Sequence, residues 1–92
     1  MIIYAEVECK LYEGHSLKQK RSVLKRLISK IQKEYNVSIT ELDYQNLWQR
    51  TKLGIAIVSN EYVHAEKMMQ KVFETIDSFP ELERTLTDIE RL

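Results

Sequence analysis

Hydrophobic and polar residues alternate at the start of the chain. From Ile3 to Leu11 the odd positions are apolar, and the charged residues Glu6, Glu8 and Lys10 occupy even positions. The apolar residues are Ile3, Ala5, Val7, Cys9 and Leu11. A period of two residues is typical of a strand with one buried face. The pattern therefore predicts a strand over residues 1 to 12.

A helical period follows Gly14. Ser16 and Gln19 have the spacing of a capping box, in which each side chain satisfies a free backbone N–H at the start of a helix. The next apolar residues form one stripe on a helix: Leu17, Leu24, Leu27, Ile28, Ile31 and Tyr35. We predict a helix that begins at Ser16 and is ended by Asn36 in a left-handed conformation.

Three further strands and a second helix are predicted from the rest of the chain. Residues 37 to 43 and 51 to 58 are rich in β-branched side chains, which favour strands. Asn60 is expected to cap a helix whose apolar residues recur at three- and four-residue steps until Pro80. Residues 82 to 89 are expected to form the last strand.

The order β-α-β-β-α-β predicts an α+β fold, the ferredoxin-like two-layer sandwich with a four-stranded antiparallel sheet. Residues 1 to 12 and 51 to 58 are the most apolar strands, so we place them at the centre of the sheet. The other two strands carry more polar side chains, as edge strands do. A single domain over residues 1 to 92 is expected, since 92 residues provide for one core.

Composition narrows the possible classes of protein. Hydrophobic residues make up 43% and charged residues 30% of the chain, which is typical of a globular domain and not of a disordered or membrane-spanning one. No signal-peptide pattern precedes the first strand, so we expect a cytoplasmic protein. The single cysteine, Cys9, can form neither an internal disulfide nor a metal cage, and we expect no cofactor and no metal.

Positive charge is concentrated in one segment. The whole chain has a formal net charge of zero, but residues 15 to 36 carry seven Lys and Arg residues against Glu34 alone. Such asymmetry indicates an anionic partner, and we predict RNA, with ribosomal RNA in translation or ribosome maturation as the expected target. The candidate nucleic-acid-binding residues are His15, Lys18, Lys20, Arg21, Lys25, Arg26 and Arg50. Lys20 falls inside the apolar stripe, where we expect Glu6 or Glu8 to hold it.

A solvated helix face is the alternative interpretation of the basic segment, because lysine and arginine favour helices and cover apolar surface with their stems. The strand at residues 51 to 58 lacks the aromatic side chains with which the sheet could bind RNA instead of the helix. RNA-binding domains of the RRM type stack bases on aromatic side chains of a central strand, and residues 52 to 58 have aliphatic ones. We therefore expect the first helix to carry any contact with RNA.

Two motifs bear a resemblance to a known family. They are HSLKQKRSVL at residues 15 to 24, and DYQNLWQR at residues 43 to 50 running into LGIAIVSN at residues 53 to 60. In these motifs, and over essentially its whole length, the chain resembles the YlxP-like family of small bacterial proteins. The resemblance implies a ferredoxin-like cytoplasmic domain of unknown function, with genes that tend to lie among translation genes.

A small enzyme is a further alternative. The start of the first helix, Gly14-His15-Ser16, could hold a phosphate on its free N–H groups. The glycine-rich loop of a nucleotide site is absent, and no nucleophile can be paired with a base. We therefore predict a non-enzymatic protein without a small-molecule substrate, and a structural role for His64.

In residues 53 to 58 both the odd and the even positions are apolar, and this suggests self-association. Two helices cover one face of a sheet, so the second face needs another cover, and we predict a homodimer. The candidate interface residues are Ile2, Tyr4, Leu53, Ile55, Ile57 and Trp48. Leu47 and Trp48 are expected to pack the loop at residues 44 to 50, and Asp43 to pair with Arg50. The alternative to RNA binding is thus a protein-interaction domain that uses the open sheet face and the Trp48 loop.

Overall fold

The computed structural model describes residues 1–12 and 16–92. Six elements follow one another in the predicted order. They are β1 (Ile2–Leu11), α1 (Leu17–Glu34), β2 (Ser38–Asp43), β3 (Arg50–Val58), α2 (Tyr62–Asp77) and β4 (Leu82–Arg91). The strand boundaries differ from the predicted ones by at most two residues.

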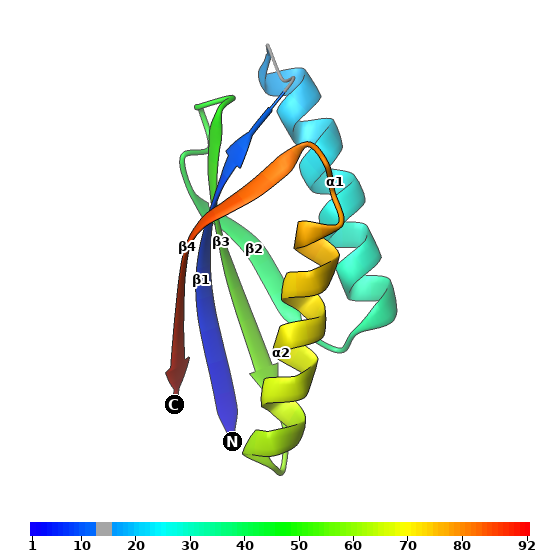
Figure 1. Cartoon of the computed structure of the whole chain (residues 1–92), viewed down its shortest axis with the longest axis vertical. Helices are drawn as coiled ribbons and strands as arrows, with labels where there is room; N and C mark the ends of the chain where they lie inside the picture. The colour runs from blue at the N-terminus through cyan, green and yellow to red at the C-terminus, as the bar shows by residue number, and fades with distance from the viewer. Residues whose placement is uncertain (13–15) are drawn as a thin grey trace.

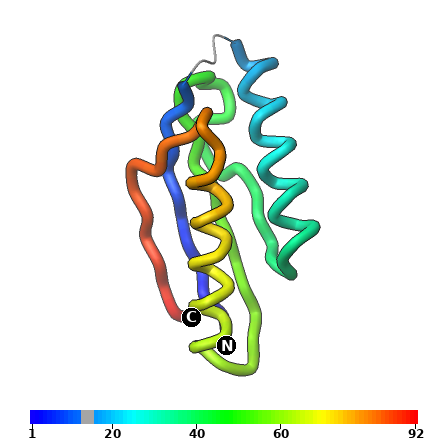
Figure 2. Tube along the Cα trace, turned by 45° about the vertical axis from the view of Figure 1, so that its right-hand side comes forward, coloured from blue at the N-terminus to red at the C-terminus, as the bar shows by residue number. Residues whose placement is uncertain are grey.

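The four strands form one antiparallel sheet in the order β2-β3-β1-β4. Both helices lie on the same side of this sheet and leave the other side open (Figure 1 and Figure 2). The predicted ferredoxin-like two-layer sandwich is therefore confirmed, with β1 and β3 at its centre.

The core lies between the sheet and the helices. Alternate residues of β1, from Ile3 to Leu11, point into it, and the apolar stripe of α1 covers them with Leu27 and Ile31. α2 contributes Val72 and several other side chains. A fully buried aliphatic side chain contributes about 1.5–3 kcal/mol relative to an exposed one, so this layer supplies most of the stability of the fold.

The end of α1 differs from the prediction. Tyr35, and not Asn36, caps the helix, and its backbone is extended with φ −134°. The Tyr35 N–H still donates to the Ile31 carbonyl, while the ring packs against the core. Left-handed backbone at Asn36 was therefore a wrong prediction, because the packing of Tyr35 turns the chain directly into an extended conformation.

The ends of α2 also differ from the prediction. Glu61 occupies the N-cap position without a side-chain cap, and the Ser59 hydroxyl accepts from its N–H at 3.2 Å. Capping by Asn60 was therefore a wrong prediction, because the helix begins one residue later than an Asn60 cap requires. The helix ends at Asp77, a few residues before Pro80. This agrees with the rule that the residue before a proline disfavours a helical backbone.

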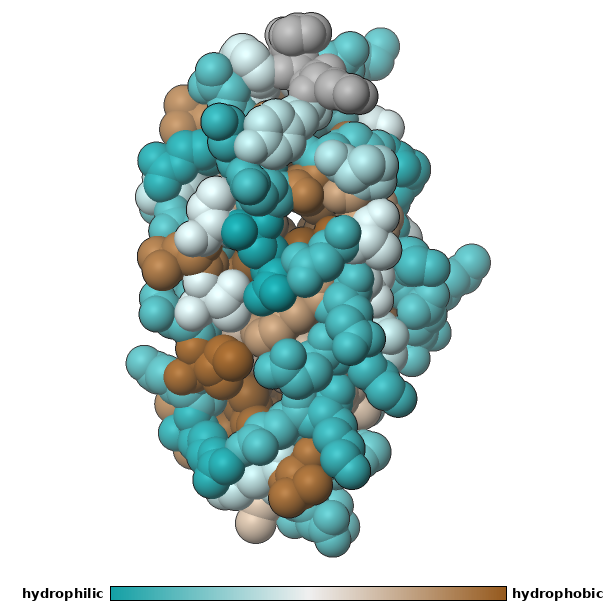
Figure 3. All heavy atoms as spheres, viewed as in Figure 1, coloured by the Kyte–Doolittle hydropathy of each residue, from teal (hydrophilic) through white to brown (hydrophobic). Residues whose placement is uncertain are grey.

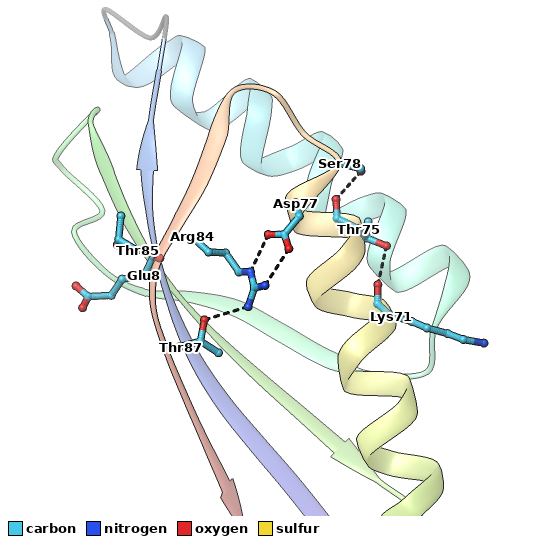
Figure 4. Close-up of polar contacts among 8 residues, drawn as sticks. All are labelled: Glu8, Lys71, Thr75, Asp77, Ser78, Arg84, Thr85 and Thr87. Atoms are coloured by element: carbon cyan, nitrogen blue, oxygen red, sulfur yellow. Dashed lines mark hydrogen bonds and ion pairs between the residues drawn. The ribbon is translucent and has the colours of Figure 1, made fainter.

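An arginine joins β4 to α2 (Figure 4). The Arg84 guanidinium donates to both Asp77 carboxylate oxygens, at 2.7 and 2.8 Å, and to the Thr87 hydroxyl at 3.1 Å. It also lies over the Phe73 ring, 4.7 Å from the centroid. Two parallel hydrogen bonds fix the geometry of such a pair, so Arg84 holds the edge strand against the helix layer.

The side of the molecule seen in Figure 3 is mainly hydrophilic, with separate hydrophobic patches. Val63 of α2 and Ile89 of β4 are among the exposed apolar residues of the protein. Within the described residues, neither helix combines the length and the apolar character that crossing a membrane requires.

Candidate nucleic-acid interface

The start of α1 is capped by Ser16, which is one half of the predicted capping box. Ser16 has an extended backbone, and its hydroxyl accepts from the Gln19 N–H at 3.1 Å. No acidic residue lies in the first turn of the helix. His15 lies outside the described residues, so its contact with RNA and the phosphate site at the helix start remain predictions.

The outer side of α1 carries exposed cations. Lys18, Arg21 and Lys25 lie at three-, four- and seven-residue steps, which places them on one side of a helix. All three residues are exposed, and none forms an ion pair with any residue in 1–12 or 16–92. Their charges therefore face solvent without a partner among these residues.

Lys20 lies on the opposite side of α1 and is buried. Its side chain is 1% exposed, and the ammonium group lies 2.9 Å from the Glu41 carboxylate. It also donates to the backbone carbonyls of Tyr44, at 2.5 Å, and Leu47, at 2.6 Å. A role for Lys20 in binding RNA was therefore a wrong prediction, since its charge is fully used inside the fold.

The partner of Lys20 also differs from the prediction. The acid is Glu41 of β2 and not Glu6 or Glu8 of β1, because both β1 carboxylates lie on the open face of the sheet. Glu41 points to the helix side and accepts a second hydrogen bond from Thr51, at 2.6 Å. Glu41 was not predicted as the partner. It lies two residues after the buried Ile39, which places it on the same face of β2 and could have indicated this contact.

Lys20 fixes the connection between β2 and β3. Tyr44 has a left-handed backbone with φ 63°, and the Leu47 N–H donates to the Tyr44 carbonyl at 3.0 Å. Lys20 holds the carbonyls at both ends of this turn. A residue of α1 thus determines the shape of a loop that lies more than twenty residues away in the sequence.

Arg26 is partly engaged within the fold. Its guanidinium donates to the Glu81 carboxylate at 2.6 Å and lies 5.6 Å from the centroid of the Phe79 ring. The hydrogen bond from Arg26 lowers the pKa of Glu81. About half of the Arg26 side chain stays exposed, so its charge is shared between Glu81 and solvent.

Arg50 lies on the other face of the molecule from the exposed cations of α1. It pairs with Glu8 across the open face of the sheet, at 2.8 Å, and its guanidinium lies 4.0 Å from the centroid of the Tyr44 ring. Asp43 accepts from the Tyr44 N–H instead. Pairing of Asp43 with Arg50 was therefore a wrong prediction.

Trp48 and Leu47 differ in burial. Trp48 is half-buried, whereas Leu47 is 45% exposed. Packing of the loop by Leu47 was a wrong prediction, because the backbone contacts to Lys20 hold this residue through its carbonyl and leave its side chain outside. The role of Trp48 in an interface remains a prediction.

The open face of the sheet carries paired charges. Lys52 lies 3.0 Å from the Glu6 carboxylate, which also accepts from the Tyr4 hydroxyl at 2.8 Å. These contacts lower the pKa of Glu6, with the Lys52 hydrogen bond as the main cause. Hydrogen bonding to Glu6 raises the pKa of Tyr4. The cations Lys52 and Arg50 of this face therefore each have an acidic partner.

The predicted interface residues lie on two different faces. Ile2 and Tyr4 belong to the open face of the sheet. Leu53, Ile55 and Ile57 are 0% exposed beneath the helices. An interface role for these three residues was therefore a wrong prediction, because they form the core of the single chain.

Other reactive groups offer little chemistry. Cys9 is buried, and burial raises the pKa of its thiol to about 12, so the thiol stays protonated at neutral pH. Among the residues that the structure describes, no cluster of three His, Cys, Asp or Glu side chains could hold a metal ion.

Comparisons with solved structures agree with the ferredoxin-like fold. A de novo designed protein with a ferredoxin fold matches at a TM-score of 0.60 and 17% identity, over 100% of this chain and 87% of the other. A protein named as a proposed chlorite dismutase matches at a TM-score of 0.56 and 18% identity, over 96% of this chain and 42% of the other. At these identities the likeness concerns the fold alone.

Sequence comparisons identify the family. Residues 2–89 match the family described as protein of unknown function, DUF503. The uncharacterized protein YlxP of Bacillus subtilis (strain 168) is 54% identical over 90 residues, which cover 98% of each chain. The resemblance to YlxP-like proteins is thus confirmed, and this chain belongs to the DUF503 family.

Proposed function

We propose that this protein is a non-enzymatic module that binds structured RNA through the outer side of α1, and that its target is ribosomal RNA, in translation or in ribosome maturation. The observation that carries the proposal is the row formed by Lys18, Arg21 and Lys25, exposed cations without an acidic partner among the described residues. Residues three or four apart on a helix lie about 5–6 Å from one another. Such a row suits successive phosphates of one strand.

The burial of the apolar side of α1 favours a polyanion over a membrane. An amphipathic helix binds a lipid surface by inserting its apolar face. In this protein Leu24, Leu27 and Ile31 are buried in the core and unavailable for insertion. Phosphate contacts from the basic side remain, and they would recognise RNA by the course of its backbone. The proposal places the protein in the cytoplasm, where such RNA is found.

Removal of two of these charges tests the proposal. Lys18→Gln/Lys25→Gln should weaken binding to a structured ribosomal RNA fragment by at least tenfold at low salt, as measured by filter binding. The matched control is Lys67→Gln/Lys71→Gln, two lysines exposed on α2, which should bind like the parent. Equal loss in both variants, or in neither, would contradict a site on α1. A DNA duplex of the same sequence serves as competitor.

A second candidate function is a protein-interaction domain that uses the open sheet face. Five of the ten exposed large hydrophobic residues of the described chain favour it, since they lie on that face or at its end. They are Ile2, Leu42, Val58, Leu86 and Leu92. Exposed apolar residues that gather on one face are typical of an interaction surface.

A further inference from the structure

On the open face of the sheet, the two central strands have an apolar end and a charged end. On the neighbouring β4, Glu90 lies beside Tyr4 and Asp88 beside Glu6. Ile2 and Val58 lie opposite each other on β1 and β3, and Tyr4 and Ala56 form the next pair on this face. Beyond them the face carries Lys52 with its acidic neighbours. The two ends would suit different contacts, so an occupant has to match both.

The geometry points to a second copy of this chain as the occupant, packed face to face with its two-fold axis parallel to the strands between β1 and β3. This inference deepens the second candidate function and does not depend on RNA binding. Sheets that pack face to face keep their strands roughly aligned, about 30° apart. Such an axis places β1 of one subunit on β3 of its partner and keeps each residue at its own height along the sheet.

The residues that this arrangement brings together are complementary in size. Tyr4 of one subunit would lie on Ala56 of the other, so a large ring meets a small side chain. Ile2 would lie on Val58, and both are exposed in the single chain. Because the axis is a two-fold, each of these contacts occurs twice.

The charges are complementary as well. Glu8 lies opposite Lys52 in the sheet register, so the same axis would place it on Lys52 of the second copy. In each chain Arg50 already pairs with Glu8, and Lys52 with Glu6. Contact between the copies would join these pairs into a row of alternating charges. An axis across the strands through Glu6 would instead place Glu6 on Glu6 and apolar residues on charged ones.

The size of the face predicts a weak dimer. Four strands about 4.8 Å apart and nine residues at about 3.3 Å give a footprint of roughly 570 Å². Stable interfaces cover about 800 Å² on each partner, and smaller ones are typical of transient complexes. The dimer should therefore form in the micromolar range. Its two α1 helices would lie on opposite outer sides, which, if the proposed function holds, makes the dimer bivalent for RNA.

Sedimentation equilibrium of the full chain without RNA tests this inference. The parent should show a monomer–dimer equilibrium, and Val58→Arg should raise the dissociation constant at least tenfold. Val63→Arg is the matched control, since Val58 is 73% exposed on the sheet and Val63 is 62% exposed on α2, so both variants should fold. A parent that sediments as an 11.0 kDa monomer at 100 µM, or a Val58→Arg variant that associates like the parent, would overturn the inference.

Discussion

The two sides of α1 use the same residue type in opposite ways. On the inner side, Lys20 is buried and its ammonium group contacts a carboxylate and two carbonyls. On the outer side, Lys18 and Lys25 face solvent. The inner cation is part of the architecture, and the outer ones are available to a partner. The net charge of a segment therefore exceeds the charge that a binding partner can reach when one of its cations faces the core.

Loss of the inner cation should have the largest effect on stability. Lys20→Met leaves Glu41 without its cation and the Tyr44 and Leu47 carbonyls without their donor. Removing one partner of a buried pair costs about 3–5 kcal/mol, so we expect a loss of about 3 kcal/mol in the free energy of unfolding in urea.

Lys25→Met is the matched control on the outer side of the same helix and should change stability by less than about 0.5 kcal/mol. The double variant Lys20→Met/Glu41→Leu should recover part of the loss, because an apolar pair can replace a buried ion pair. Equal unfolding midpoints for the two single variants would contradict the distinction between the two sides of α1.

Trp48→Ala should have an intermediate effect. Trp48 is half-buried and belongs to the loop that Lys20 already holds by its backbone, so we expect a loss of about 1–2 kcal/mol in thermal unfolding. Leu47→Ala, at an exposed side chain of the same loop, serves as the control and should cost less than half as much. A Trp48→Ala variant as stable as the parent would assign this residue to recognition alone.

Arg26 lies between the two sides, and its effect should be the smallest. An exposed ion pair contributes about 0–1 kcal/mol. Because Arg26 lowers the pKa of Glu81 in the folded state, the pair stabilises the protein above the carboxyl's unfolded pKa. That contribution is lost as the pH falls through the folded pKa. The difference in unfolding free energy between parent and Arg26→Gln should thus shrink between pH 7 and pH 3, and a constant difference would contradict the pair's role.

Regular features of this fold could be predicted from the sequence because they depend on local periodicity. The alternation in β1, the cap at Ser16 and the apolar stripe of α1 each involve residues close together in the chain. Even the burial of Lys20 was indicated by its position within that stripe. Its partner was not, since Glu41 is set by the register of β2 against β3 and by the side of α1 that covers them.

Features that depend on tertiary packing were predicted less well. Asn36 has the side chain of a left-handed cap, but the packing of Tyr35 ends the helix first. Leu53 was predicted to lie in an interface, but it is buried beneath the helices. The alternation of residues along a strand separates its two faces and does not show which of them the helices cover. Arg50 was counted with the basic helix, whereas its strand places it on the opposite face beside Glu8.

The central claim is that the outer cations of α1 contact phosphates, and a salt titration of RNA binding tests it most directly. The parent and a Lys18→Gln/Arg21→Gln/Lys25→Gln variant of equal thermal stability would be titrated with a bacterial ribosomal RNA fragment. Each phosphate contact contributes about 0.7–0.9 to the slope of log affinity against log salt. We predict that the variant's slope is smaller by about two to three, and equal slopes and affinities for the two proteins would contradict the claim.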